Sequence, residues 1–252
     1  MNIGKVYLIG AGPGDVELLT LKAARILGEA DVVLLDDLVN REVLQFVRPD
    51  AEVVEVGKRG GCKSTPQVSI HERMLLYVKA GKVVARLKGG DPYVFGRGGE
   101  EMQFLAAAGV SAEVISGVTA GVAVPAALGI PVTHRDCARS VTFITGHTHN
   151  DCTFDWRALA AIGGTLVIYM GITNLPNIVA ELLAAGLPPL RPAAAIQNGT
   201  SPQQRSVITT LVALPSAVQI HGLDSPSIII IGDVVGIAAS LSIKKELIEE
   251  PS

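Results

Sequence analysis

The chain has 252 residues, of which 48% are hydrophobic, and its mean hydropathy of +0.41 is high for a soluble protein. The apolar stretch 118–132 contains two glycines and two prolines, so it does not supply the roughly 18 continuous apolar residues of a membrane-spanning helix. The net charge of −3 argues against nonspecific nucleic-acid binding by the whole surface. We therefore expect neither a membrane nor a nucleic acid as partner.

Strand-like and helix-like segments alternate along the chain, which predicts a mostly parallel α/β sheet. Asp15 is placed to cap a first helix that carries apolar residues from Leu18 to Leu27, and later helices close at Gly81 and Gly109. The expected strands are Val6–Ile9, Val32–Leu35, Glu52–Val56, Val83–Leu87, Ala112–Ile115, Val141–Thr145, Thr165–Met170, Ala193–Gln197, Val207–Thr210 and Ser227–Ile231.

The segment 129–135 interrupts this alternation and is typical of a linker. The sequence therefore predicts an N-terminal α/β lobe at 1–132 and a C-terminal α/β lobe at 133–242. The charged segment 243–252 is predicted to be a frayed helix or a disordered tail.

Two glycine-rich loops resemble nucleotide sites without meeting their requirements. Gly10–Asp15 follows a strand, but its G-x-G-x-G spacing is not that of a dinucleotide site, and Pro13 has no backbone N–H for a phosphate. Gly57–Ser64 has Cys62 where a P-loop requires glycine. Gly10–Asp15 is thus either a loop that binds a ligand without phosphates or a plain turn. The mismatch in Gly57–Ser64 leads us to reject hydrolysis of nucleoside triphosphates.

The segment Lys88–Glu101 carries the strongest functional signal, with five glycines directly after a strand. Asp91 can accept hydrogen bonds there, while Arg97, Glu100 and Glu101 bring charge to a helix start, where Glu also simply complements the helix dipole. Seven basic residues lie near expected strand ends or in loops. Either they are ordinary solvated charges, or several converge on a cleft that would suit a polycarboxylate. These residues are Lys58, Arg59, Arg86, Lys88, Arg97, Arg135 and Arg139.

Metal and disulfide chemistry are not expected. The run His147–Cys152 lacks the further cysteine or histidine pair that a tetrahedral zinc site needs. Three cysteines without a CxxC pair favour a reducing compartment, and residues 1–5 do not read as a signal peptide. We expect a cytoplasmic protein without a metal.

Eleven motifs together resemble, in order and spacing, those of the uroporphyrinogen-III C-methyltransferases of the tetrapyrrole methylase family. The resemblance covers nearly the whole chain; one departure is Asp233, where the family more often has Glu. The motifs are Ile9–Asp15, Asp36–Val39, Val56–Arg59, Lys88–Pro92, Phe95–Glu101, Gly117–Gly121, Gly129–Arg135, Thr145–His147, Tyr169–Gly171, Gly199–Gln204 and Gly232–Val235.

This resemblance implies a two-lobed tetrapyrrole-methylase fold, of the non-Rossmann class of S-adenosylmethionine-dependent methyltransferases. It further implies a homodimer with S-adenosylmethionine as methyl donor bound between the lobes, and S-adenosylhomocysteine as product. Asp36 and Lys58 match the proton acceptor and donor, and Arg97 and Glu100 match a pair on the substrate side. The cofactor site would be lined by Pro13, Gly89, Gly90, Asp91, Val94, Thr119, Ala120, Met170 and Gly199.

The implied reaction is methylation of uroporphyrinogen III at two pyrrole carbons, through precorrin-1 to precorrin-2. A pyrrole carbon of this electron-rich macrocycle attacks the sulfonium methyl directly, so the protein supplies alignment and then removes a proton. Asp36 after a strand is also a good helix cap, so the identity of the base stays open. So does the pathway served, which is that of sirohaem, cobalamin or haem d1.

Three alternatives remain. The chain could act on a later precorrin, act as a relative of the same fold on RNA or a protein side chain, or serve as a regulatory module that binds the cofactor without catalysis. The complete Phe95–Glu101 motif and the modest charge disfavour RNA, and the intact Arg97, Glu100 and Met170 disfavour a regulatory module.

Overall fold

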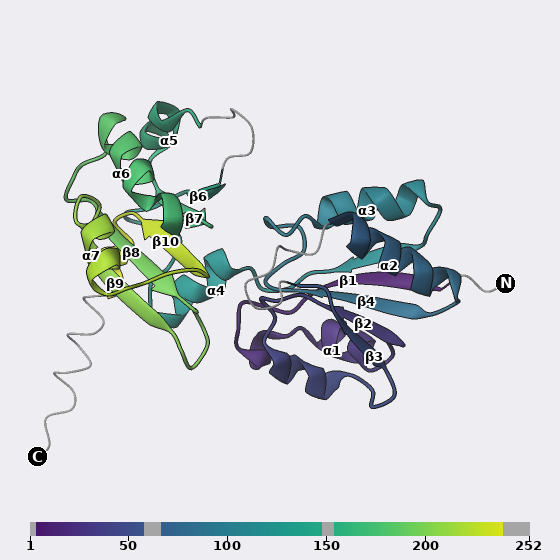
Figure 1. The fold of residues 1–252 in the computed structure, drawn as a ribbon. Helices are drawn as coiled ribbons and strands as arrows, with labels where there is room; N and C mark the ends of the chain where they lie inside the picture. The colour runs from purple at the N-terminus through teal and green to yellow at the C-terminus, as the bar shows by residue number, and fades with distance from the viewer. Residues whose placement is uncertain (1–3, 58–66, 148–153, 239–252) are drawn as a thin grey trace, which may run out of the picture. The chain divides into compact units, whose positions relative to one another are not determined.

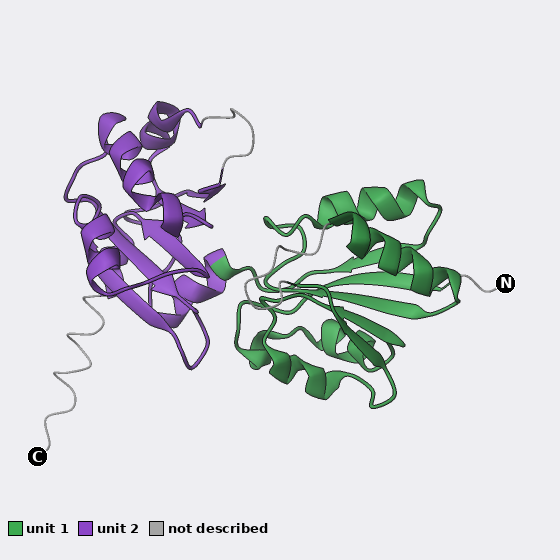
Figure 2. Ribbon diagram, viewed as in Figure 1, with its two compact units in different colours: residues 1–120 green, residues 121–252 purple. Residues whose placement is uncertain are grey.

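The structure, a computed structural model, describes residues 4–57, 67–147 and 154–238 (Figure 1). The chain divides into two compact units, residues 1–120 and residues 121–252 (Figure 2). Each unit has its own five-stranded sheet, and we describe each unit by itself.

The sheet of the first unit is entirely parallel, in the order β3-β2-β4-β1-β5. Because all five strands point the same way, the loops that follow them lie at one edge, the carboxyl edge of the sheet. The strands are β1 (Lys5–Gly10), β2 (Val32–Leu35), β3 (Glu52–Glu55), β4 (Val83–Lys88) and β5 (Ala112–Ile115).

Helices cover both faces of this sheet (Figure 1). One face packs on the 3-10 turn η1 (Val16–Leu18), α1 (Leu21–Leu27) and the 3-10 segment η2 (Arg41–Phe46), and the other on α2 (Gln67–Lys79) and α3 (Gly98–Ala107). Alternate residues of a strand serve opposite cores: Ala85 and Leu87 face α1, whereas Val84 faces α2. Arg86 and Lys88 share the parity of Val84, which places two charged side chains on the α2 and α3 face.

The second unit contains a mixed sheet in the order β6-β7-β10-β8-β9. Within it, β6 and β7 are parallel, while β10 is antiparallel to β7 and β8, and β8 is antiparallel to β9. The expectation of a mostly parallel sheet is therefore wrong for this unit. The elements are α4 (Ala120–Ala127), β6 (Val141–Thr145), α5 (Trp156–Ile162), β7 (Thr165–Tyr169), η3 (Ile172–Asn174), α6 (Leu175–Ala184), β8 (Pro192–Gln197), β9 (Arg205–Thr210), α7 (Leu214–Ile220) and β10 (Ser227–Ile231).

The ten predicted strands are confirmed to within two residues at either end. The helix endings are also confirmed, since α2 and α3 stop just before Gly81 and Gly109, which have φ of +80° and +68°. The first helix differs: Asp15 caps only η1, and Thr20 caps α1 by accepting a hydrogen bond from the Ala23 N–H at 3.2 Å. The unit boundary at 120/121 precedes the predicted linker, because α4 packs on residues of the second sheet, as shown below.

Across the described residues, no helix is long and apolar enough to cross a membrane.

Candidate active site at the carboxyl edge of the first sheet

Three glycine-rich loops meet at the carboxyl edge of the first sheet. Gly12 and Gly90 exchange backbone hydrogen bonds, with N···O distances of 3.3 Å and 2.7 Å. A Cβ added to Gly117 would lie 2.3 Å from the Gly90 oxygen, and one added to Gly10 would lie 2.5 Å from the Gly117 nitrogen. Any side chain at Gly10 or Gly117 would therefore push these backbones apart. Gly10 of the Gly10–Asp15 loop thus has a packing reason that the sequence did not reveal.

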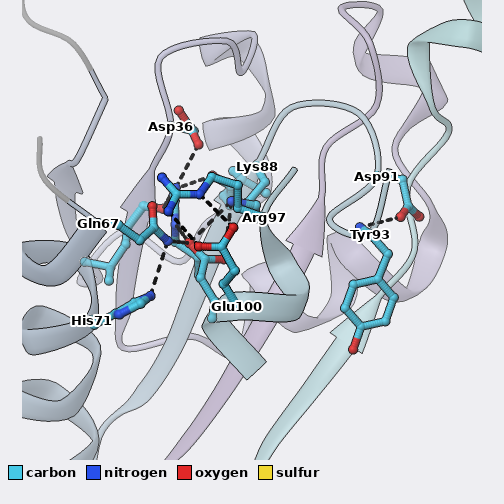
Figure 3. A network of polar contacts seen from close by, with 12 residues as sticks. Asp36, Gln67, His71, Lys88, Asp91, Tyr93, Arg97 and Glu100 are labelled. Atoms are coloured by element: carbon cyan, nitrogen blue, oxygen red, sulfur yellow. Dashed lines mark hydrogen bonds and ion pairs between the residues drawn. The ribbon is translucent and has the colours of Figure 1, made fainter. Parts of the chain in front are cut away.

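Asp91 ties two of these loops together. Its Oδ1 accepts a hydrogen bond from the Tyr93 N–H at 2.8 Å (Figure 3). Its Oδ2 accepts one from the Gly117 N–H at 3.1 Å. The first bond shapes the loop after β4, and the second links it to the loop after β5. The carboxylate is therefore a structural part of the loop arrangement, beside the cofactor role implied by the resemblance.

Open space lies beside Gly90, which has φ of +64°. A Cβ built there would have only the Ala120 nitrogen at 3.8 Å and the Thr119 Cα at 4.0 Å as near neighbours. Pro13 follows Gly12 in the adjoining loop and offers no N–H to a phosphate. The carboxyl edge therefore suits a ligand that approaches the loop backbone and carries no phosphate, which S-adenosylmethionine satisfies.

Arg97 and Glu100 form an exposed, two-pronged ion pair at the start of α3. Arg97 has φ of +58°, and its Nε and Nη2 donate to the two Glu100 oxygens at 3.0 Å and 2.6 Å (Figure 3). The hydrogen bond to Glu100 raises the pKa of Arg97, and the same bond lowers the pKa of Glu100. Because the side chains are 56% and 55% exposed, an incoming carboxylate can compete for the guanidinium.

A buried charge cluster lies on the α2 and α3 face. Glu101 is fully buried and lies within 3.2 Å of Arg86 Nε and 3.3 Å of Lys88 Nζ, while Arg86 and Lys88 are only 2% and 5% exposed. Arg86 also reaches Asp36, with 2.8 Å between Nη2 and Oδ2. The interpretations of Arg86 and Lys88 as solvated charges or as binders of a polycarboxylate ligand are therefore wrong, because both side chains are enclosed and contact carboxylates of the protein itself. Their spacing by two residues on a strand was the available signal.

His71 of α2 extends this cluster toward solvent. Its Nε2 lies 3.3 Å from Gln67 Nε2, which also donates to Glu101 Oε1 at 3.0 Å, and its ring stacks on Phe104 at 4.3 Å between centroids. Partial burial lowers the pKa of His71, opposed by the charge of Glu101. The structure thus favours neutral His71, which accepts from Gln67.

This environment makes a pH prediction. Since the pKa of His71 is lower in the folded state, the unfolded state binds more protons as pH falls below about 6.5, so stability is present above that pH and declines below it. We expect the free energy of unfolding of His71→Gln to decline less at low pH. The difference is about 1.4 kcal/mol for each tenfold difference in the proton affinity of His71 between the folded and unfolded states.

Calorimetric unfolding between about pH 8 and about pH 5 measures the effect. The reference is the unmodified protein, unfolded over the same pH range in the same buffers. An equally steep decline in His71→Gln would contradict the prediction.

In the second unit, α4 packs on two loops that carry predicted cofactor residues. The Gly121 N–H donates to the Tyr169 hydroxyl at 2.7 Å, and Tyr169 directly precedes Met170, which has φ of +52°. A Cβ added to Gly199 would lie 2.3 Å from Val124 Cγ1. Helix α4 thus contacts both the segment before Met170 and the segment at Gly199.

The structure therefore gathers seven of the predicted cofactor residues in the loops of the first unit. These are Pro13, Gly89, Gly90, Asp91, Val94, Thr119 and Ala120, whereas Met170 and Gly199 lie in the second unit. Lys58, the stretch 60–63, most of the histidine-rich run 147–152 and the tail 243–252 lie outside the described residues. Among the residues described, no three His, Cys, Asp or Glu side chains group as metal ligands would.

Comparisons with known proteins agree with this geometry. A model of the tetrapyrrole (corrin/porphyrin) methylases matches residues 5–215. The uroporphyrinogen-III C-methyltransferase of Pseudomonas aeruginosa is 51% identical over 92% of this chain and 94% of its own. The chain spans about half the length of the siroheme synthases that it also matches.

Solved structures give the same assignment. The uroporphyrin-III C-methyltransferase of Thermus thermophilus in complex with S-adenyl homocysteine superposes with a TM-score of 0.78 at 41% identity, over 92% of this chain and 93% of that one. A cobalt precorrin-4 methyltransferase superposes with a TM-score of 0.82 at 29% identity, over 92% and 95%. The two-sheet fold with glycine loops at a carboxyl edge is thus that of S-adenosylmethionine-dependent methyltransferases. The chain belongs to the tetrapyrrole methylase family.

Proposed function

We propose that this protein transfers methyl groups from S-adenosylmethionine to two pyrrole carbons of uroporphyrinogen III, through precorrin-1 to precorrin-2. The observation that carries the proposal is that two features lie at the carboxyl edge of the first sheet. One is the set of contacting glycine loops, which suits a ligand without phosphate, and the other is the exposed Arg97–Glu100 pair. The near full-length similarity to uroporphyrinogen-III C-methyltransferases supports the choice of substrate.

The proposed roles follow from the chemistry of the residues. S-adenosylmethionine supplies a methyl group on a sulfonium sulfur, and the loops around Gly90 and Asp91 hold it. The resemblance assigns Met170 and Gly199 to the cofactor as well. Arg97 binds a carboxylate of the macrocycle as a planar double donor, with Glu100 orienting the guanidinium. Asp36 accepts the proton that the methylated macrocycle releases, and Lys58 acts as donor. Alignment of carbon and methyl supplies the main acceleration.

The proposed setting is a homodimer in the cytoplasm without a resident metal. The product enters the sirohaem, cobalamin or haem d1 branch, and similarity to siroheme synthases supports the first of these.

The test is incubation of the purified protein with uroporphyrinogen III and labelled S-adenosylmethionine, followed by counting of methyl groups. Two methyl groups per macrocycle are expected. The similarity to the cobalt precorrin-4 methyltransferase makes a later precorrin the second candidate. Methylation of a later precorrin and not of uroporphyrinogen III would favour that candidate, and cofactor binding without turnover on either would favour a regulatory module.

A further inference from the structure

We propose that Arg86 is a positioning residue for methyl transfer, which holds the Asp36 carboxylate where it accepts the proton, and that buried Glu101 holds Arg86 in turn. This inference rests on the proposed function, because it assigns Arg86 and Glu101 to the proton-removal step of that reaction. In the preceding methyl transfer a C–C bond forms and the S–C bond breaks, with its electron pair left on sulfur. The cationic macrocycle then loses one proton to Asp36.

The guanidinium of Arg86 is held on several sides at once. Its Nη1 donates to the Leu34 and Leu87 carbonyl oxygens at 3.3 Å and 3.2 Å, and its Nε donates to Glu101 Oε1 at 3.2 Å. These acceptors belong to β2, β4 and α3, so the planar group has little freedom to turn. Its remaining nitrogen, Nη2, donates to Asp36 Oδ2 at 2.8 Å.

Asp36 joins this buried group to the site. It follows β2 at the carboxyl edge, and its side chain is 31% exposed, whereas that of Arg86 is 3% exposed. Oδ1 also accepts from the Asp37 N–H at 2.8 Å, so each oxygen has one fixed donor. A carboxylate has about four lone-pair sites, and two therefore remain for a proton. A carboxylate held by two donors and still open to the edge is suited to take a proton from a bound substrate.

Glu101 explains why Arg86 stays in place. The carboxylate is fully buried and meets Arg86, Lys88 and Gln67, each within hydrogen-bonding or ion-pair distance. Burial lowers the pKa of Lys88, and the neighbouring Arg86 lowers it further, so the cluster carries an electrostatic cost. Buried ion clusters are frequently no more stabilising than apolar side chains of the same volume. The contact that apolar side chains could not replace is the one from Arg86 to Asp36.

A double-mutant cycle with Asp36→Asn tests the proposal. Arg86→Lys keeps a positive charge beside Glu101 but removes the planar fork that reaches Asp36. We expect kcat to fall about 100-fold, the cost of misplacing a catalytic group, with the KM for uroporphyrinogen III and the Kd for S-adenosylmethionine changed by no more than about twofold. In the Asp36→Asn background, Arg86→Lys should lower kcat by no more than about twofold further.

Lys88→Met is the matched control, because Lys88 lies on the same strand and contacts the same Glu101, whereas its interaction with Asp36 is a longer-range attraction between charges without a hydrogen bond. We expect its effect on kcat to be equal with and without Asp36→Asn. Glu101→Gln leaves Arg86 intact and should lower kcat only in the presence of Asp36. Glu101→Gln is also the substitute variant if Arg86→Lys does not fold. Calorimetric unfolding shows whether Arg86→Lys folds.

The positioning role would be overturned if Arg86→Lys lowered kcat by the same factor with Asp36 as with Asp36→Asn. If Arg86→Lys does not fold, the same comparison is made with Glu101→Gln. Failure of the unmodified protein to methylate uroporphyrinogen III would instead overturn the proposed function. The Arg86–Asp36 contact remains measurable in that case, as non-additive changes in the free energy of unfolding in the same cycle. Non-additivity there would support the contact, and additivity would overturn it.

Discussion

Arg97→Ala should abolish most methyl transfer while the protein still binds S-adenosylmethionine. The guanidinium forms a two-pronged pair with Glu100 and is half-exposed, so it offers a planar pair of donors to a substrate carboxylate. Removing such a charged contact should lower kcat/KM for uroporphyrinogen III at least 100-fold, or about 2.7 kcal/mol. Cofactor affinity should change little, because the glycine loops that meet around Gly90 do not involve the Arg97 side chain.

The matched control is Arg25→Ala. Arg25 of α1 and Glu29, just after its end, form an exposed ion pair with side-chain exposures of 60% and 56%, close to those of Arg97 and Glu100. An exposed pair of this kind contributes about 0.2–1 kcal/mol to stability, so its loss should leave turnover unchanged. Steady-state kinetics and calorimetric titration with S-adenosylhomocysteine separate the two quantities. Near-normal turnover of Arg97→Ala would refute the assignment of Arg97 to the substrate.

Gly117→Ala should have a large effect on cofactor binding. The added Cβ would lie 2.3 Å from the Gly90 oxygen and 2.7 Å from the Gly10 Cα, and both neighbours are backbone atoms that cannot rotate away. The loops after β1, β4 and β5 would separate. Overpacking of this kind costs about 1–3 kcal/mol of stability. We expect the Kd for S-adenosylhomocysteine to rise at least about tenfold.

Gly28→Ala serves as the control for this substitution. Gly28 ends α1 with φ of −68°, and a Cβ there would have its nearest neighbour at 3.4 Å, an ordinary contact distance. Alanine at such a position stabilises by about 0.4–1 kcal/mol and should leave cofactor binding intact. Unchanged affinity in Gly117→Ala, measured by calorimetric titration, would show that the close loop contact is dispensable for the ligand.

The sequence predicted much of the fold for a physical reason. Strands buried on both faces read as short apolar runs, and glycines with positive φ end helices at Gly81 and Gly109, so both signals are local. The loops Gly10–Asp15 and Lys88–Glu101 were also recognisable locally, because each glycine-rich run directly follows an apolar strand. Strand direction in the second sheet depends on which distant strands pair, and the local pattern contains no information about that pairing.

The sequence by itself thus determined the α/β class, the ten strands and the loops that carry the site. It also singled out Arg97 and Glu100, whose spacing of three residues at a helix start makes them neighbours. Only the tertiary structure decided that Asp36, Arg86 and Glu101 form one cluster, because three elements far apart in sequence supply them. Likewise, Asp91 and the glycines meet only after folding, since their partners belong to separate loops. Local pattern is written in neighbouring residues, whereas a site that joins several strands exists only once the sheet has formed.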